Sequence, residues 1–156
     1  MNGRVVAGGI VVSALLAGAA IYWLQIYAFY EPVAFTPGEE IRLTPIIGEE
    51  PEVIVANDVT GIDADSSPLR FRACFTTPLT QAMLTETYRV YDEATPLVAP
   101  GWFDCFDAGQ IDAALKTGEA IAFLSEAEVA DGVDRVVAVF ADGRGYAWHQ
   151  LNPEEE

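Results

Sequence analysis

An uncharged stretch near the N-terminus, residues 5–30, restricts the fold of this chain more than any other feature. About 20 apolar residues cross the hydrocarbon core of a bilayer as a helix, because each residue adds about 1.5 Å. Backbone polar groups find no water there, so a helix that satisfies them internally is favoured. We therefore expect residues 5–30 to form a transmembrane anchor surrounded by membrane lipid.

The charges that flank this stretch predict its orientation. Arg4 precedes the stretch, and Glu31 and Glu39 follow it. Basic residues are retained on the cytoplasmic side, so residues 1–4 are expected in the cytoplasm and the chain after residue 30 outside it. Aromatic residues gather at the far end, as they do at membrane interfaces: Tyr22, Trp23, Tyr27, Phe29 and Tyr30.

A cleaved signal peptide is the alternative to a retained anchor. The small residues Ala17, Gly18 and Ala19 resemble a cleavage site that follows a short apolar region. The apolar run nevertheless continues through residues 21–26, beyond the length typical of signal peptides, and this favours retention. Both interpretations place the remaining chain in the same compartment.

Small residues recur along the expected anchor. Gly9, Ser13 and Ala17 lie four residues apart and would share one helix face. Such stripes let two helices approach closely in lipid, so this face is a candidate for packing against another membrane-protein subunit. Simple anchors also contain many Gly and Ala residues by composition, and this second explanation stays open.

The exported part, residues 31–156, is strongly acidic. It contains all 24 Asp and Glu residues but only seven of the eight Lys and Arg residues, a formal charge of −17. Such a surface repels nucleic acid and anionic lipid headgroups and attracts basic partners. Solubility alone would also account for it. Nucleic acid is therefore excluded as a partner, and the sequence identifies no small-molecule substrate.

Alternating and helical patterns predict an α+β fold, in which a small, mainly antiparallel sheet carries two short helices. We expect a linker over 31–40, a domain over 41–151 and an acidic tail over 152–156. Strands are expected at 41–44, 51–56, 69–75, 88–91, 120–124, 135–141 and 146–151. Helices are expected from Thr77 to Leu84 and from Asp107 to Gly118.

Three local signals refine this expectation. Asp142 and Gly143 lie between two β-rich runs and predict a hairpin turn. Residues 57–68 are polar and rich in turn formers, so a loop is expected there. Residues 125–128 repeat a capping-box pattern and predict one helical turn.

The chain has two cysteines, Cys74 and Cys105. An even pair in an oxidising compartment predicts one disulfide. Phe75 and Phe106 directly follow the cysteines and suggest an apolar, buried and structural bridge. A redox-active pair and a pair of metal ligands are the alternatives, although neither cysteine lies in a Cys-x-x-Cys motif.

Residues that could perform chemistry are few. His149 is the single histidine, and no nucleophile elbow, phosphate loop or zinc motif is present in the sequence. We therefore expect no catalytic residue, no metal site and no cofactor. Trp102 and Phe103 form an aromatic pair that could anchor a partner or fill the core beside the disulfide.

Three stretches resemble a family of small membrane proteins of alphaproteobacteria that has no assigned activity. They are residues 72–78 (RACFTTP), 99–107 (APGWFDCFD) and 132–139 (GVDRVVAV), and the N-terminal anchor is similar as well. The resemblance implies a bacterial inner membrane, and with the orientation predicted from the flanking charges this places the N-terminus in the cytoplasm and the domain in the periplasm. It implies no functional residue.

Two classes of function follow from these observations. The first is a membrane-anchored accessory or scaffold protein, without enzymatic activity, that associates with a larger inner-membrane complex of the respiratory or photosynthetic type. The second is a periplasmic thiol, redox or ligand-handling protein that uses Cys74 and Cys105. An inert buried disulfide favours the first class, and an exposed, easily reduced one favours the second.

Overall fold

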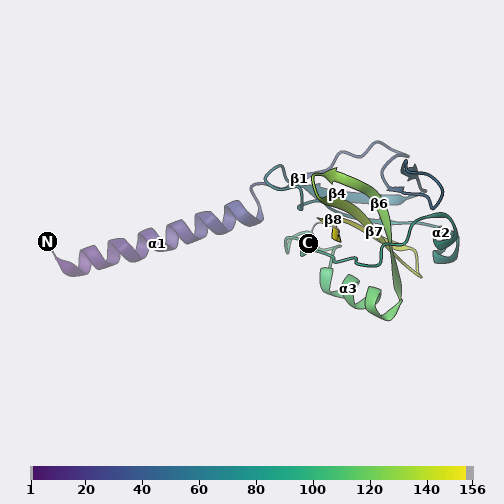
Figure 1. Ribbon diagram of the computed structural model, residues 1–156. Helices are drawn as coiled ribbons and strands as arrows, with labels where there is room; N and C mark the ends of the chain where they lie inside the picture. The colour runs from purple at the N-terminus through teal and green to yellow at the C-terminus, as the bar shows by residue number, and fades with distance from the viewer. Residues whose placement is uncertain (1, 154–156) are drawn as a thin grey trace. The chain divides into compact units, whose positions relative to one another are not determined.

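The computed structural model describes residues 2–153 and divides the chain into two units, residues 1–30 and 31–156 (Figure 1). The first unit consists of helix α1 (Gly3–Ile26), which has 24 residues and a mean hydropathy of 2.2. None of its residues is buried, and Asn2 caps its start by accepting a hydrogen bond from the Arg4 amide. This helix is long and apolar enough to span a membrane.

The second unit is built on an antiparallel six-stranded sheet with the strand order β1-β4-β5-β8-β7-β6. Its strands are β1 (Glu31–Pro32), β4 (Asn57–Asp63), β5 (Arg72–Thr76), β6 (Ala120–Ala130), β7 (Val133–Phe140) and β8 (Arg144–Leu151). A two-stranded sheet and two helices complete the unit: β2 (Arg42–Leu43), β3 (Glu52–Val53), α2 (Gln81–Thr87) and α3 (Ala108–Thr117). The predicted α+β class is confirmed.

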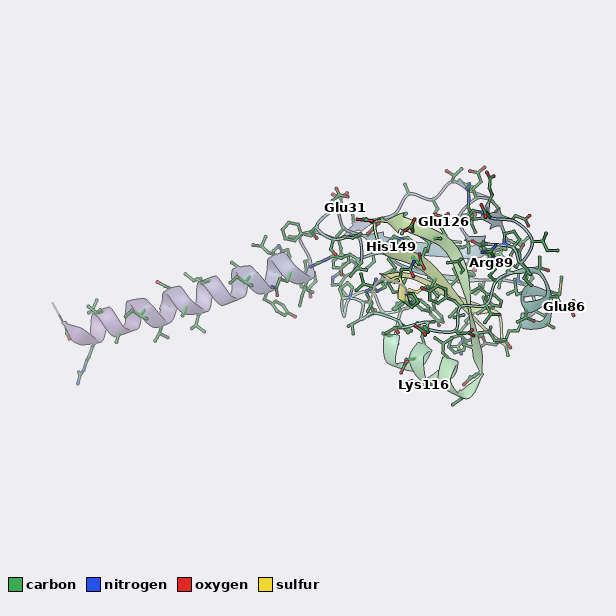
Figure 2. All side chains as sticks on the ribbon, viewed as in Figure 1. Glu31, Glu86, Arg89, Lys116, Glu126 and His149 are labelled. Atoms are coloured by element: carbon green, nitrogen blue, oxygen red, sulfur yellow. A yellow bond between two sulfur atoms is a disulfide. The ribbon has the colours of Figure 1, made fainter. Side chains whose placement is uncertain are left out.

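Both faces of the central sheet are covered, because residues of β5, β6, β7 and β8 alternate between two cores. On β5, Ala73 and Phe75 enter the first core, and Cys74 enters the second. Figure 1 shows α3 on one side of the sheet and the segment with β2 and β3 on the other. Side chains fill the space on both sides (Figure 2).

The strongest local signals formed the expected structures. Helix α3 starts at the cap Asp107, whose carboxylate accepts a hydrogen bond from the Gln110 amide at 3.0 Å. It ends at Gly118, whose φ of 80° is the left-handed conformation that favours glycine. Strands β7 and β8 form the hairpin predicted around Asp142 and Gly143.

The segment 31–40, expected to be a linker, is part of the folded domain. Glu31 and Pro32 form the edge strand β1 on β4, and the next residues, Val33 and Phe35, pack against the first core. Phe35 lies so close to Gly61 on β4 that a Cβ there would be 2.7 Å from its ring. The turn-forming residues of this segment suggested a linker, and its contacts could not be predicted because they involve residues far along the chain.

The polar stretch 57–68, expected to be a loop, begins with strand β4. Its pairing with β5 is irregular between Asn57 and Thr60, and Asp58 has a positive φ of 53°. This irregularity breaks the alternation by which a strand is recognised in sequence. Pairing with β1 and β5 on either side determines the strand instead.

The helical turn expected at residues 125–128 is wrong, because β6 continues through it to Ala130. The polar groups of Ser125 and Glu128 that were expected to cap a helix form hydrogen bonds to other strands. The Ser125 hydroxyl donates to the Arg42 carbonyl at 2.6 Å, and the Asp134 carboxylate accepts from the Glu128 amide at 2.9 Å. These bonds hold an irregular strand in place of a helix.

Two further elements differ from the expectation. Helix α2 starts after Thr80, whose hydroxyl caps it by accepting from the Met83 amide at 3.3 Å. The Thr77 hydroxyl lies in the turn before the helix, where it accepts from the Leu79 amide at 3.2 Å and donates to the Val55 carbonyl at 2.8 Å. Residues 88–91 form only isolated bridges at Tyr88 and Val90. In the expected tail, the Asn152 amide donates to the Gly132 carbonyl at 2.8 Å, and residues 154–156 lie outside the described part.

Candidate functional site

The longest segment without helix or strand in the described domain is residues 92–107, called here the strap. Segments of this kind longer than about 12–15 residues are uncommon in compact domains and are usually functional when they are ordered. The strap runs from the end of the 88–91 bridges to the start of α3. Some of its apolar residues pack against the second core, and a disulfide joins its Cys105 to Cys74 on β5.

Arg72 on β5 holds the middle of the strap. Its side chain is only 3% exposed, and its guanidinium donates to the carbonyls of Leu97 at 2.9 Å and Val98 at 3.2 Å. It also donates to the carbonyls of Leu69 and Phe71 at 2.8 and 2.6 Å. These four carbonyls compensate for the cost of burying the Arg72 cation.

Gln150 on β8 holds the beginning of the strap. Its side-chain oxygen accepts from the Thr95 amide at 2.7 Å and from the Trp148 indole at 2.9 Å. Its side-chain nitrogen donates to the Glu93 carbonyl at 3.0 Å. A buried amide with these partners fixes the backbone of the strap at two points.

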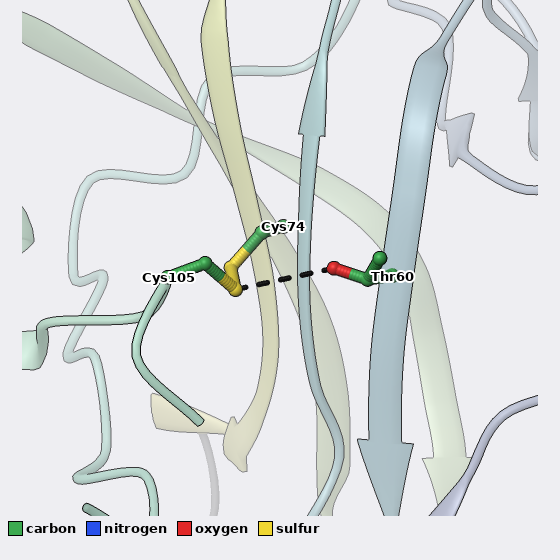
Figure 3. The surroundings of a disulfide bond; sticks show 3 residues. All are labelled: Thr60, Cys74 and Cys105. Atoms are coloured by element: carbon green, nitrogen blue, oxygen red, sulfur yellow. Dashed lines mark hydrogen bonds between the residues drawn. A yellow bond between two sulfur atoms is a disulfide. The ribbon is translucent and has the colours of Figure 1, made fainter. Parts of the chain in front are cut away.

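The disulfide holds the end of the strap. Cys74 on β5 is bonded to Cys105, as predicted, and the Thr60 hydroxyl on β4 donates to the Cys105 sulfur over 4.0 Å (Figure 3). Cys74 is 8% exposed, whereas Cys105 is exposed. The expectation of a buried bridge therefore holds for one of its two cysteines.

Trp102 and Phe103, the aromatic pair considered in the sequence, differ in burial. Phe103 is half-buried and packs against the second core, whereas Trp102 is 37% exposed. The two rings meet edge to face with centroids 6.4 Å apart. Val98, also on the strap, is 81% exposed. The strap therefore carries apolar side chains on its outside while its backbone is fixed from within.

A groove of about 550 Å³ runs beside the strap. Its wall includes Leu97 from the strap and both Asp112 and Lys116 from α3. The Lys116 ammonium donates to the Asp112 carboxylate at 2.6 Å, so these two charges are paired with each other. Among residues 2–153, no three His, Cys, Asp or Glu side chains are grouped as metal ligands would be.

The small-residue stripe of α1 is open. A Cβ at Gly9 would meet nothing within 4 Å, and no residue of the helix is buried. The Ser13 hydroxyl donates to the Gly9 carbonyl at 2.8 Å, so this hydroxyl is satisfied within its own helix. Ala17 follows at the same spacing. The stripe can therefore contact another helix without exposing an unsatisfied polar group to lipid.

A cluster of polar side chains around His149 and Arg135 was not predicted from the sequence. Figure 2 labels His149 and Glu126 on neighbouring parts of the sheet. The Arg135 Nε donates to the His149 Nε2 at 3.0 Å, and an Arg135 terminal nitrogen lies 3.6 Å from the Glu126 carboxylate. Burial, with Arg135 nearby, lowers the pKa of His149 to about 4. This neutral histidine serves packing and hydrogen bonding.

Arg72, Gln150 and Arg135 are the residues that sequence reasoning missed. Each is a polar residue inside an otherwise apolar strand, which is the one signal that could have found them. Their partners are mainly backbone carbonyls and distant side chains, which no local pattern reveals.

The described residues thus form a small α+β domain with one disulfide, preceded in the chain by one apolar helix. The chain belongs to a family of unknown function (DUF6446), whose model matches residues 41–156. This confirms that the domain belongs to a family of unassigned activity; the alphaproteobacterial origin and the single-pass membrane nature of that family stay predictions. No curated protein and no solved structure matches the chain.

Proposed function

We propose that this protein is a membrane-anchored periplasmic accessory or scaffold protein, which associates with a larger complex of the bacterial inner membrane. The strap is the observation that carries this proposal. Arg72, Gln150 and the disulfide fix its backbone, while Val98 and Trp102 stay on the outside. Binding to a fixed surface costs little ordering entropy, and exposed aromatic residues are typical interface anchors.

The anchor and the charge of the domain support the same proposal. An open stripe at Gly9, Ser13 and Ala17 offers a face for another transmembrane helix. Arg4 before the helix and the acidic chain after it favour a periplasmic domain. The charge of −17 over residues 31–156 would steer that domain toward basic surfaces of a partner.

Co-purification of full-length variants tests the role of the strap. Val98→Ala with Trp102→Ala should reduce recovery of the partner subunits about tenfold or more, a change of ~1.4 kcal/mol in binding. Met83→Ala on α2 is the matched control, because it removes an exposed apolar side chain elsewhere. Equal recovery with the strap variant and the control would contradict the proposal.

A second candidate function is thiol–disulfide exchange, and the exposure of Cys105 favours it. This cysteine lines a pocket of about 250 Å³ together with Arg144 and Tyr146. A dithiol donor would attack the Cys105 sulfur with one thiolate and release the Cys74 thiolate, which then takes up a proton. The donor's second thiol would displace Cys105, so the donor is oxidised as this protein is reduced.

The carboxylates of Asp104 and Asp107 line the same pocket and oppose an incoming thiolate, so this function ranks second. Equilibration of the full-length protein with glutathione buffers separates the two candidates. A reduction potential below about −300 mV indicates a structural bridge, and a potential near −200 mV indicates exchange.

A further inference from the structure

The loop between β2 and β3, residues 44–51, presents two isoleucines to solvent. Ile47 is 94% exposed, more than any other large apolar side chain in the described domain, and Ile46 beside it is half exposed. Burying such a side chain stabilises a protein by about 1.5–3 kcal/mol, and this chain forgoes that gain at two consecutive positions. The loop lies in the layer that covers the first core, whereas the strap covers the second.

The backbone of this loop is fixed on both sides of Ile47. Arg89 donates from its Nε to the Pro45 carbonyl at 3.0 Å and from a terminal nitrogen to the Gly48 carbonyl at 2.7 Å. The Ile46 amide donates to the Thr87 carbonyl at 2.9 Å. Figure 2 labels Arg89 beside the α2 end of the domain. The isoleucines are therefore held outward by bonds that a merely flexible loop does not make.

Carboxylates follow this apolar tip closely along the chain. Glu49 and Glu50 come after Ile47 and Gly48, and Glu52 begins β3; all three are exposed. Arg89, the cation closest in the hydrogen-bond pattern, is engaged with backbone carbonyls. Anionic headgroups would be repelled by these carboxylates, and so would a second copy of the same loop. A surface that carries Lys or Arg would be attracted.

We propose that residues 44–51 form a second docking element, whose partner is a protein surface with an apolar pocket bordered by Lys or Arg side chains. Ile47 and Ile46 would fill the pocket, and the carboxylates of Glu49, Glu50 and Glu52 would meet the basic border. This inference rests on the proposed function, because the partner surface belongs to the same membrane complex and is reached by a different face of the domain.

Photo-cross-linking in intact cells tests the proposal with the full-length chain. The probe p-benzoylphenylalanine replaces Ile47, and in a control it replaces Lys116 on α3, whose side chain is also exposed. The Ile47 probe should label one protein, at a peptide that mass spectrometry shows to be apolar and flanked by Lys or Arg. The control position should give at least about tenfold less of this product.

Charge reversal identifies the basic border. Glu49→Lys, Glu50→Lys and Glu52→Lys together should lower the cross-link yield about tenfold, and changing the partner's flanking basic residues to Glu should restore it. Near-ultraviolet circular dichroism of the full-length variant in detergent checks that the domain stays folded. If the triple variant is unfolded, Glu49→Gln with Glu50→Gln provides the same comparison with a smaller expected loss.

Several outcomes would overturn the inference. Cross-links to phospholipid, to a second copy of this chain, or in a yield equal to that of the Lys116 control each contradict it. A complex on native gels with no cross-link from position 47 rejects the docking loop and leaves the proposed function intact. The absence of any complex on native gels, combined with a specific cross-link, rejects the proposed function but retains this loop as a binding element.

Discussion

Arg135 donates a hydrogen bond from its Nε to the Nε2 of His149 at 3.0 Å. Because the guanidinium has no acceptor, His149 must be neutral, with its proton on Nδ1. That proton is donated to the Pro68 carbonyl at 2.7 Å. The imidazole ring of His149 stacks on the ring of Phe71, with the two centroids 4.7 Å apart. The Arg135 guanidinium also lies over the Phe71 ring, 4.4 Å from its centroid.

The pH dependence of stability follows from this pair. Burial lowers the pKa of His149 from 6.5 to about 4. Between these pH values His149 is protonated in the unfolded chain but neutral in the folded chain. Stability should therefore fall as the pH drops from about 6.5 to 4, by on the order of 3 kcal/mol. Urea unfolding of the full chain in detergent at several pH values measures this fall.

His149→Gln is the control for this prediction, because it keeps a polar side chain and removes the titration. Burial also raises the pKa of the Asp63 carboxyl, which stabilises the folded chain at low pH and so opposes the histidine effect. The difference between the wild-type protein and the variant isolates His149. Parallel curves for the two proteins between pH 6.5 and 4 would contradict the assignment.

The ring of Phe75 on β5 occupies the space that a side chain at Gly145, its register partner on β8, would need. A Cβ at this position would lie 2.2 Å from that ring. Gly145→Ala should destabilise the domain by about 1–3 kcal/mol through overpacking, and Phe75→Leu in the same chain should recover part of the loss. Gly101→Ala, where a Cβ meets nothing within 4 Å, should change stability little. Thermal unfolding compares the three, and an unchanged Gly145→Ala protein would disprove the contact.

Arg72 should be essential for the order of the strap. Arg72→Lys keeps the charge but cannot reach the carbonyls of Leu97 and Val98 together, so we expect a loss of about 2–4 kcal/mol. Hydrogen exchange should quicken in the amides of residues 92–107 before it does in β7. Arg144→Lys, at an exposed ion pair with Asp142, should cost less than about 1 kcal/mol. Equal effects of the two substitutions would argue against a specific role for Arg72.

The disulfide should stabilise the domain without being required for its fold. Cys74→Ala with Cys105→Ala should lower stability by about 3–4 kcal/mol, because the bridge joins residues 31 apart in the sequence. Non-reducing mass spectrometry of protein purified without reductant should find the two peptides linked. Free thiols at both positions would refute the bridge.

Local signals predicted those elements whose bonds are themselves local. The Asp107 cap and Gly118 define α3 within one stretch of chain, and the Asp142–Gly143 turn joins adjacent strands. Strand β4 and the far end of β6 could not be found in this way. Their positions depend on pairing and on bonds such as that from Ser125 to Arg42, which lie 83 residues apart.

The candidate site was predicted in part for the same reason. The cysteine pair followed from their number and compartment, and Trp102 from its residue type. The bonds from Arg72 and Gln150 that fix the strap cross from strands to an irregular segment, and no sequence spacing encodes them. The exposure of Ile47 could not be predicted from the sequence either, because an isoleucine after Pro45 and Ile46 is typical of a buried strand.

The state of the full-length protein after gentle extraction tests the central claim most directly. Membranes are dissolved in a mild detergent, separated on a native gel, and the band containing this chain is analysed by mass spectrometry. We expect the chain in a band with other membrane-protein subunits, and Gly9→Leu or Ser13→Leu should weaken this association while the domain stays folded. High salt should weaken it further if the acidic surface contributes. Migration of this chain alone, as a monomer or simple dimer under every gentle condition, would contradict the account.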